Sequence, residues 1–158
     1  RLDAAGVRWE VTPGVPAYAA AAAVLGRELT GPLVTQSVVL TRTQAASTAM
    51  PQREALAAFA ATQATLVLHL AITRIRALMA ELAPGYGGDC PVAVVSRASQ
   101  PQELVLRGTI TDIADAVEAA GLRSAAVILV GRALADLPDP CAGQSHLYDP
   151  ARDRSGPG

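Results

Sequence analysis

Short apolar runs rich in β-branched residues alternate with helix-like stretches along this chain, and this alternation limits the possible folds more than any other feature. The expected strands are Val7–Val11, Gln36–Thr41, Thr65–Leu70, Pro91–Ser96, Leu104–Ile110 and Ala125–Val130. The expected helices are Pro16–Leu25, Pro51–Ala61, Thr73–Leu82 and Asp112–Ala120. Such an order predicts an α/β domain with a mixed β-sheet flanked by helices.

Glycine, proline and small polar residues mark where these elements should begin and end. We expect Gly26 and Gly121 to end helices, and Thr111 to cap the helix that follows it. A turn at Ser99–Gln102 would join two strands as an antiparallel hairpin. Small residues predict a loop at Ala45–Met50. After the third helix the chain should break at a group of four residues: Pro84, Gly85, Gly87 and Gly88.

The charge balance excludes several classes of function. The net charge is -1, which gives no electrostatic footprint for nucleic acid and no basic cluster for an anionic membrane. All 13 basic residues are arginine, so lysine Schiff bases and the phosphate-loop lysine are excluded. Arginine is a permanent, fork-shaped cation suited to carboxylates. The longest apolar tract, Ala17–Gly26, is far shorter than the roughly 20 residues a bilayer requires.

The two cysteines, Cys90 and Cys141, lie far apart and neither belongs to a Cys-x-x-Cys pair. With only two histidines in the chain, we expect no metal site. We interpret both thiols as free, which favours a reducing, cytoplasmic compartment.

The segment Thr12–Ala17 is the first candidate for a binding site, because a strand would enter a tight turn and then a helix there. Gly14 would let the backbone approach a ligand, and the helix that follows would offer unpaired N–H groups. An ordinary turn between a strand and a helix would have the same residue types, so spacing alone leaves both interpretations open.

The end of the expected third strand is the second candidate. Leu70 and Ala71 end this strand, and strand ends in α/β sheets face ligand crevices, although both residues could equally be core. His69 could act as a base or be a packed residue, and no partner carboxylate is visible from its spacing. Arginines near the ends of expected elements could clamp a polycarboxylate ligand or simply be solvated: Arg42, Arg74, Arg76, Arg97 and Arg107.

Five segments together resemble the tetrapyrrole (corrin/porphyrin) methyltransferase family, in the order that the family has them. Val11–Ala17 is similar to its Val-x-Pro-Gly-Val segment, and Thr65–Ala71 to its central strand, where many relatives have Met-Gly in place of Leu70-Ala71. Asp89–Val95 with Ser99, Pro101 and Glu103 resembles its hairpin, and two more segments complete the pattern: Arg107–Ile110 and Ala126–Gly131.

The resemblance implies an enzyme that uses S-adenosyl-L-methionine, without a metal, to methylate a ring carbon of a tetrapyrrole. Thr12, the Leu-His-Leu-Ala stretch, the Cys-Pro-Val-Ala-Val-Val run and Leu147–Pro150 favour the branch that acts on carbon 11 of precorrin-4 in cobalamin biosynthesis. Because the methyl carbon is already activated by the cofactor, no catalytic side chain is assigned. The implied cofactor contacts are Gly14, Pro16, Ala17, Leu70, Ala71, Ala93, Gly108 and Thr109, and Arg74 is the implied substrate contact.

The resemblance also implies the domain organisation. The family has two α/β domains, and its Gly-x-Gly-Pro-Gly-Asp loop does not occur in this chain, which begins at Arg1. We therefore expect residues 1–30 to be the last strand and helix of an N-terminal domain, residues 31–135 to be the C-terminal α/β domain, and residues 136–158 to be a polar tail. The full-length protein should be a homodimer, and the fragment alone should be inactive. The alternatives are methylation of another precorrin or tetrapyrrole, and a non-catalytic α/β binding module.

Overall fold

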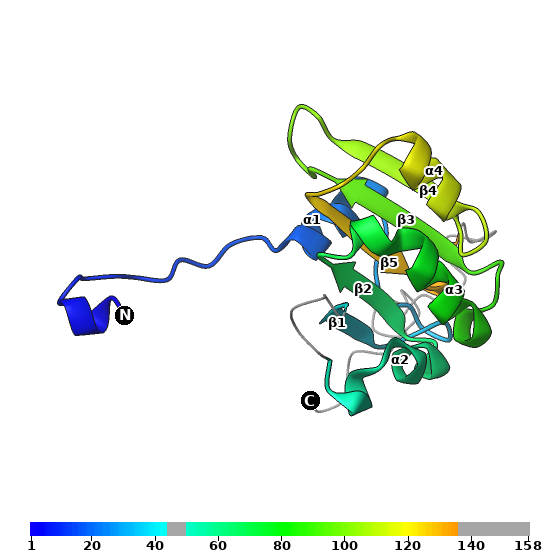
Figure 1. Cartoon of the computed structure of the whole chain (residues 1–158), viewed down its shortest axis with the longest axis horizontal. Helices are drawn as coiled ribbons and strands as arrows, with labels where there is room; N and C mark the ends of the chain where they lie inside the picture. Colours follow the sequence, from blue (N-terminus) through cyan, green and yellow to red (C-terminus); the bar gives the residue numbers. More distant parts are fainter. Residues whose placement is uncertain (44–49, 136–158) are drawn as a thin grey trace, which may run out of the picture.

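The computed structural model describes residues 1–43 and 50–135, and these contain nine regular elements (Figure 1). The helices are α1 (Ala17–Leu25), α2 (Leu56–Thr62), α3 (Ile75–Tyr86) and α4 (Ile113–Ala119). The strands are β1 (Val38–Arg42), β2 (Thr65–His69), β3 (Pro91–Ser96), β4 (Leu104–Thr109) and β5 (Ala126–Val130). The predicted loop at 45–49, the tail from Pro138, Cys141 and Leu147–Pro150 lie outside the described residues.

The five strands form one mixed sheet in the order β1-β2-β5-β3-β4, which confirms the predicted fold class. Strands β1 and β2 are parallel, and the β2–β5, β5–β3 and β3–β4 pairs are antiparallel. The expected hairpin is therefore present, with Ser96 paired with Leu104 next to its turn. This topology brings the carboxyl ends of β1, β2 and β3 to the same edge of the sheet as the amino ends of β4 and β5.

Alternating side chains bury both faces of the sheet, as the nearly continuous apolar runs predict. One face packs against α2, α3 and α4, and its buried strand residues include Leu66, Leu68, Val92, Val94, Ile128 and Val130. The other face packs against Ala21 and Leu25 of α1 through Val67, Ala93, Val95, Val127 and Leu129. Figure 1 shows α3 and α4 in front of the sheet, and the molecule is a three-layer sandwich of helices, sheet and helix.

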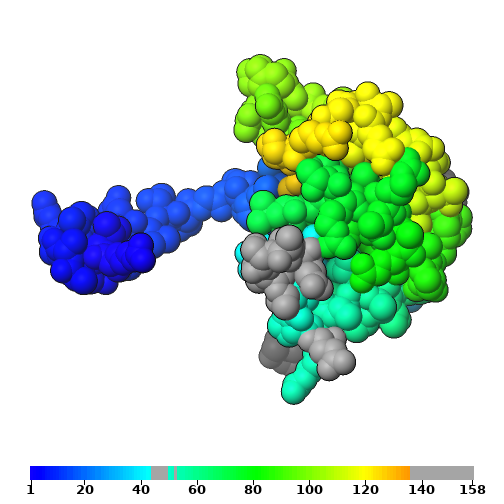
Figure 2. Space-filling model, in the orientation of Figure 1, coloured from blue at the N-terminus to red at the C-terminus, as the bar shows by residue number. Residues whose placement is uncertain are grey.

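The predicted strand at Val7–Val11 is wrong for this structure, because the segment has no strand partner. Residues 1–16 are exposed and extend away from the body, with one 3₁₀ turn at Asp3–Ala5 (Figures 1 and 2). The alternating pattern is typical of a strand, but a strand requires a neighbouring edge for its backbone hydrogen bonds. No edge of the described sheet lies beside these residues.

The second and third helices also differ from the expectation. The stretch Pro51–Ala61 is not one helix, because Ala55 adopts an extended backbone (ψ = 138°) between a 3₁₀ turn at Gln52–Glu54 and α2. Helix α3 continues through Pro84 and Gly85, which were expected to break it, and ends at Tyr86 before Gly87.

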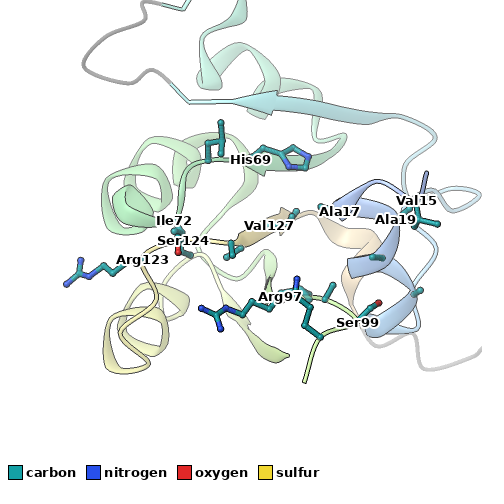
Figure 3. A pocket seen from close by; sticks show the side chains of 18 of the residues that line it. Val15, Ala17, Ala19, His69, Ile72, Arg97, Ser99, Arg123, Ser124 and Val127 are labelled. Carbon is teal, nitrogen blue, oxygen red and sulfur yellow. The ribbon is translucent and has the colours of Figure 1, made fainter. Parts of the chain in front are cut away.

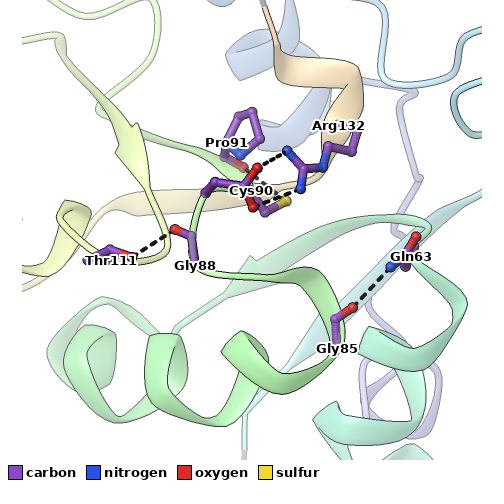
Figure 4. A network of polar contacts seen from close by, with 8 residues as sticks. Gln63, Gly85, Gly88, Cys90, Pro91, Thr111 and Arg132 are labelled. Atoms are coloured by element: carbon purple, nitrogen blue, oxygen red, sulfur yellow. Dashed lines mark hydrogen bonds and ion pairs between the residues drawn. The ribbon is translucent and has the colours of Figure 1, made fainter.

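Close packing between α2 and α3 explains the glycine inside α3. A Cβ atom added to Gly85 would lie 2.6 Å from Ala60 Cβ and 2.8 Å from the Ala60 carbonyl carbon. Gln63, which follows α2, donates a side-chain hydrogen bond to the Gly85 carbonyl at 3.1 Å (Figure 4). The glycine thus permits the two helices to touch, and the helix continues because its packing outweighs its poor local propensity.

The predicted caps are partly confirmed. Gly26 and Gly121 follow α1 and α4 with the left-handed φ values of 62° and 65° that favour glycine at these positions. The prediction for Thr111 is wrong, since Asp112 occupies the N-cap position of α4 and makes no side-chain cap bond. The Thr111 hydroxyl instead donates to the Gly88 carbonyl at 2.9 Å, which ties the start of α4 to the loop before β3 (Figure 4).

Candidate functional site

A cleft of about 890 Å³ lies at the sheet edge where the carboxyl ends of β2 and β3 meet the amino end of β5 (Figure 3). Its volume falls in the range of roughly 300–1,000 Å³ that is usual for small-molecule sites. Helix α1 forms one wall, and the ends of β2, β3 and β5 with their adjoining loops form most of the rest. The cleft is therefore built at the edge where α/β sheets commonly bind ligands.

The α1 wall of the cleft is made of small apolar side chains: Ala17, Ala19, Ala20 and Ala23. Alanine methyl groups allow a ligand to come close to the helix without losing side-chain entropy. Pro16 is the N-cap residue of α1, and its carbonyl accepts the amides of Ala19 and Ala20. The first amides of the helix have no acceptor within it, and Ala17 brings this end of the helix to the cleft.

Left-handed backbone conformations gather around this cleft. Among the described residues, six non-glycine residues have positive φ, and four of these line the cleft: Leu70 (56°), Arg97 (51°), Ser99 (64°) and Ala125 (54°). Such a conformation costs about 1–2 kcal/mol for each residue with a Cβ atom. Strain of this kind persists where the surrounding structure over-determines it, and it is typical of ligand-binding sites.

Leu70 is the most exposed large apolar residue of the cleft, with 82% of its surface accessible. It directly follows β2 and precedes the buried Ala71, so the left-handed turn at Leu70 directs one side chain outward and the next into the core. An exposed leucine held in a strained conformation suits contact with a ligand better than it suits contact with water.

The polar side chains of the cleft carry no negative charge. His69, Arg97 and Arg123 line it together with four uncharged polar residues: Thr73, Ser99, Gln100 and Ser124. Neither Asp nor Glu occurs among the described residues that line the cleft. The site therefore combines an apolar wall with cationic groups, which suits a ligand that has both apolar surface and carboxylates.

The cofactor contacts implied by the resemblance do not all lie at this cleft. Ala17 and Leu70 line it, and Pro16 precedes Ala17. Gly14 lies in the exposed arm, where an added Cβ atom would meet nothing within 4 Å. Ala71 is buried directly after Leu70. The contacts of Gly14 and Ala71 with the cofactor stay predictions.

Ala93, Gly108 and Thr109 lie elsewhere in the sheet. Ala93 is 2% exposed and packs inside the α1 face. Gly108 pairs with Val92 and Thr109 with Pro91, at the end of β3 opposite to the cleft. Because neighbouring positions point to opposite faces, a side chain at Gly108 would point toward Asp112 on the α4 side. Their contacts with the cofactor also stay predictions.

Arg74 lies at a separate, smaller hollow of about 220 Å³ that it shares with Thr43, Glu54 and Glu81. The contact of Arg74 with a substrate stays a prediction.

Two other arginines have structural partners. Arg76 binds Asp115 and Glu118 at 2.6 Å. The hydrogen bonds to Glu118 contribute most, and the one to Asp115 next, to raising the pKa of Arg76. Arg107 donates to the Leu25 carbonyl at 3.2 Å, where a cation stabilises the carboxyl end of α1.

A polar network fastens the opposite end of the sheet (Figure 4). Arg132 binds both carboxylate oxygens of Asp89 at 2.9 Å, and this hydrogen-bonded contact lowers the pKa of Asp89. The adjacent Cys90 is a free, buried thiol, and burial raises its pKa. A raised pKa disfavours the reactive thiolate, so Cys90 is a packing residue.

The described ranges, 1–43 and 50–135, contain no group of three or more His, Cys, Asp or Glu residues able to hold a metal ion. In the same ranges no helix is long and apolar enough to cross a bilayer.

Comparison with known proteins places the chain in a family. The profile of the tetrapyrrole (corrin/porphyrin) methylases matches residues 1–114. The chain belongs to this family. Three features that carried the resemblance lie within the match: the segment before α1, the end of β2 and the β3–β4 hairpin.

Curated tetrapyrrole methylases similar to this chain include enzymes of precorrin-4 methylation. The precorrin-4 C(11)-methyltransferase of Rhodococcus erythropolis is 53% identical over 157 residues, which are 98% of this chain and 61% of that protein. The cobalt-precorrin-4 C(11)-methyltransferase of Methanocaldococcus jannaschii is 40% identical over 134 residues, 84% of this chain and 51% of that protein. The chain thus spans half to three fifths of the length of these two relatives.

Solved tetrapyrrole methylases share the fold. Cobalt precorrin-4 methyltransferase, CbiF, aligns with a TM-score of 0.80 and 39% identity, over 85% of this chain and 56% of that one. Uroporphyrin-III C-methyltransferase from Thermus thermophilus, complexed with S-adenosyl homocysteine, aligns with a TM-score of 0.65 and 25% identity, over 84% of this chain and 57% of that one.

Proposed function

We propose that the cleft beside α1 binds S-adenosylmethionine, and that the protein to which this chain corresponds methylates carbon 11 of precorrin-4. The observation that carries the proposal is that the cleft unites Ala17, which follows the turn before α1, with Leu70, at the end of β2. These segments are far apart in sequence, and the family resemblance had implied both as cofactor contacts. The S-adenosyl homocysteine in the Thermus thermophilus relative and the 53% identical precorrin-4 enzyme support this choice.

The residues of the cleft fit this cofactor. The alanine wall and Leu70 offer apolar surface to an adenosine and a thioether chain. The amino end of α1 and the arginines of the cleft offer donors to a carboxylate. When bound, S-adenosylmethionine supplies an activated methyl group, so the side chains of this chain need only bind and orient. Correct alignment of reacting atoms can supply roughly 7–11 kcal/mol of a barrier.

We propose that a second wall of the cleft comes from another part of the full-length protein. Val7, Trp9 and Val11 alternate with polar residues in this arm, and each is at least half exposed. Such a pattern suits a strand in a sheet other than the one that the described residues form. We infer that residues 1–30 belong to that second domain, residues 31–135 to the domain described above and residues 136–158 to a tail.

Two further proposals concern the setting of the enzyme. A cytoplasmic location is supported by the free thiol of Cys90. Homodimerisation of the full-length protein rests on the family resemblance alone, and sedimentation of that protein at several concentrations tests it.

A matched pair of leucine variants tests cofactor binding at the cleft. Leu70 and Leu33 are both exposed and both have positive φ, but only Leu70 lines the cleft. Replacement by glycine relieves the same backbone strain at both positions. Titration followed by nuclear magnetic resonance should show that S-adenosyl homocysteine binds the chain, and that Leu70→Gly weakens binding about tenfold, as expected when a leucine contact worth about 1.5 kcal/mol is lost.

Leu33→Gly should leave the affinity for S-adenosyl homocysteine unchanged. Equal affinities of wild type, Leu70→Gly and Leu33→Gly would show that the ligand does not contact Leu70 and would contradict the proposed site. Absence of any binding by the wild-type chain would contradict it as well.

A further inference from the structure

Two arginines stand at the side of the cleft that faces away from α1. Arg97 follows β3, and Arg123 precedes β5. In Figure 3 both guanidinium groups point toward the same side of the view, away from Ala17 and Ala19 on the helix wall. The cleft is therefore polarised, with small apolar side chains on one side and two permanent cations on the other.

The loops that carry these arginines are fastened to each other. The Arg97 amide donates to the Ala125 carbonyl at 2.9 Å, and the Ser96 hydroxyl donates to the same carbonyl at 3.3 Å. Arg97 and Ala125 both have left-handed φ values, 51° and 54°. The paired, strained turns fix the backbone from which both arginine side chains extend, so both cations are carried at the same rim of the cleft.

Neither arginine of the cleft forms an ion pair or a side-chain hydrogen bond within the part of the chain that the structure describes. Arg76 and Arg132, in contrast, each bind a carboxylate at 2.9 Å or less. Glu118 feels the charge of Arg123, but its pKa is lowered mainly by its hydrogen bonds with Arg76 and least by Arg123.

We propose that Arg97 and Arg123 together bind carboxylate groups of the ligand, and this inference rests on the function proposed above. A guanidinium group matches a carboxylate through two parallel hydrogen bonds, and it keeps its charge at every physiological pH. Two sources present this chemistry: the side chains of a tetrapyrrole and the amino-acid end of S-adenosylmethionine. The absence of acidic residues among the described residues of the cleft favours an anion of either source.

The test compares two double variants of the chain that lose the same charge. Arg97→Gln with Arg123→Gln removes the pair, whereas Arg8→Gln with Arg53→Gln removes two exposed arginines outside the cleft. The probes are uroporphyrin, its esterified form, S-adenosyl homocysteine and 5′-methylthioadenosine, which lacks the amino-acid end. Circular dichroism checks that both variants keep the fold of the wild-type chain.

We expect the cleft variant to bind uroporphyrin or S-adenosyl homocysteine at least tenfold more weakly than the control variant does. Its affinity for the partner probe without carboxylates should be unchanged. Loss confined to uroporphyrin assigns the pair to the substrate, and loss confined to S-adenosyl homocysteine assigns it to the cofactor. Equal binding of all probes by both variants would overturn the carboxylate role while leaving the proposed function intact. A wild-type chain that binds none of the four probes would overturn both.

Discussion

The Arg97 amide donates a hydrogen bond to the Ala125 carbonyl at 2.9 Å, and both residues are held in the left-handed region of backbone conformation. This bond joins the turn after β3 to the turn before β5, directly beside the antiparallel pair of Ser96 and Ala126. The edge of the cleft is thus an extension of the sheet rather than an independent loop. A ligand that binds there meets a surface already ordered by the fold, which lowers the entropic cost of binding.

Gly85, the one glycine within α3, should tolerate substitution poorly. Its hydrogen atom faces Ala60, and an added methyl group would collide with both the side chain and the backbone of that residue. We expect Gly85→Ala to lower the free energy of unfolding by about 1–3 kcal/mol, the usual cost of overpacking, despite the better helix propensity of alanine. Urea unfolding measures this change. Gly14→Ala is the control, since nothing lies within 4 Å of that position, and an equal effect of the two changes would refute the packing argument.

Substitution of Gly108 should destabilise the fold, for a reason separate from the cofactor contact that the resemblance implies. A Cβ atom there would collide with Asp112 Oδ1, which accepts the Thr109 amide at 2.7 Å. Gly108→Ala should displace this carboxylate and cost about 1 kcal/mol of stability, the value of one hydrogen bond.

A double-mutant cycle with Asp112→Ala measures the coupling between these two positions. In the Asp112→Ala background Gly108→Ala should cost less than it does in the wild-type chain, because the displaced group is gone. Equal costs in both backgrounds would show that Asp112 does not respond to the added methyl group.

Tyr86 should give the fold a dependence on alkaline pH. Burial is the larger cause, and the nearby Cys90 the smaller one, that raises the pKa of Tyr86 to about 12. The Tyr86 hydroxyl donates a hydrogen bond to the Ala64 carbonyl at 2.6 Å. The unfolded chain releases this proton near pH 10 and the folded chain near pH 12, so the contribution of Tyr86 is complete below pH 10 and is lost as pH rises to 12.

The variant Tyr86→Phe isolates this contribution. Chemical unfolding is measured at pH values from about 9 to about 12, in steps of about one pH unit, so that the series spans both pKa values. The free energy of unfolding should fall more steeply with pH for wild type than for Tyr86→Phe. Parallel profiles for the two proteins would mean that Tyr86 does not carry the effect.

Much of the sheet could be predicted from the sequence because its strands are short, apolar and bounded by turn residues. The segments Pro91–Ser96 and Ala126–Val130 are nearly continuous runs of aliphatic residues, and both are central strands. Val7–Val11 shows the limit of this reasoning. Its alternation is typical of a strand, but local pattern cannot show whether a pairing edge exists, and this structure provides none.

The site was predictable in part for a related reason. Leu70 could be placed at a strand end, where α/β sheets bind ligands, and the structure does place it at the cleft. Its left-handed backbone could not be predicted, because φ > 0 is rare for leucine. Arg97 was one of five candidate arginines, and only tertiary structure separates it from Arg107, which stabilises the end of α1. The sequence around Arg123 shows only a short loop after Gly121, which does not mark this arginine as a binding residue.

The two-wall arrangement is tested most directly by methyl transfer itself. The 158-residue chain would be compared with the same chain joined to the part of the Rhodococcus erythropolis relative that it does not match. Each protein is incubated with S-adenosylmethionine and precorrin-4, and mass spectrometry of the product detects the replacement of one ring hydrogen by one methyl group. The joined protein should transfer the methyl group to precorrin-4, and the chain alone should not, because one wall cannot hold both reactants in alignment. Turnover by the chain alone at a rate close to that of the joined protein, or failure of the joined protein on precorrin-4, would contradict the proposed function.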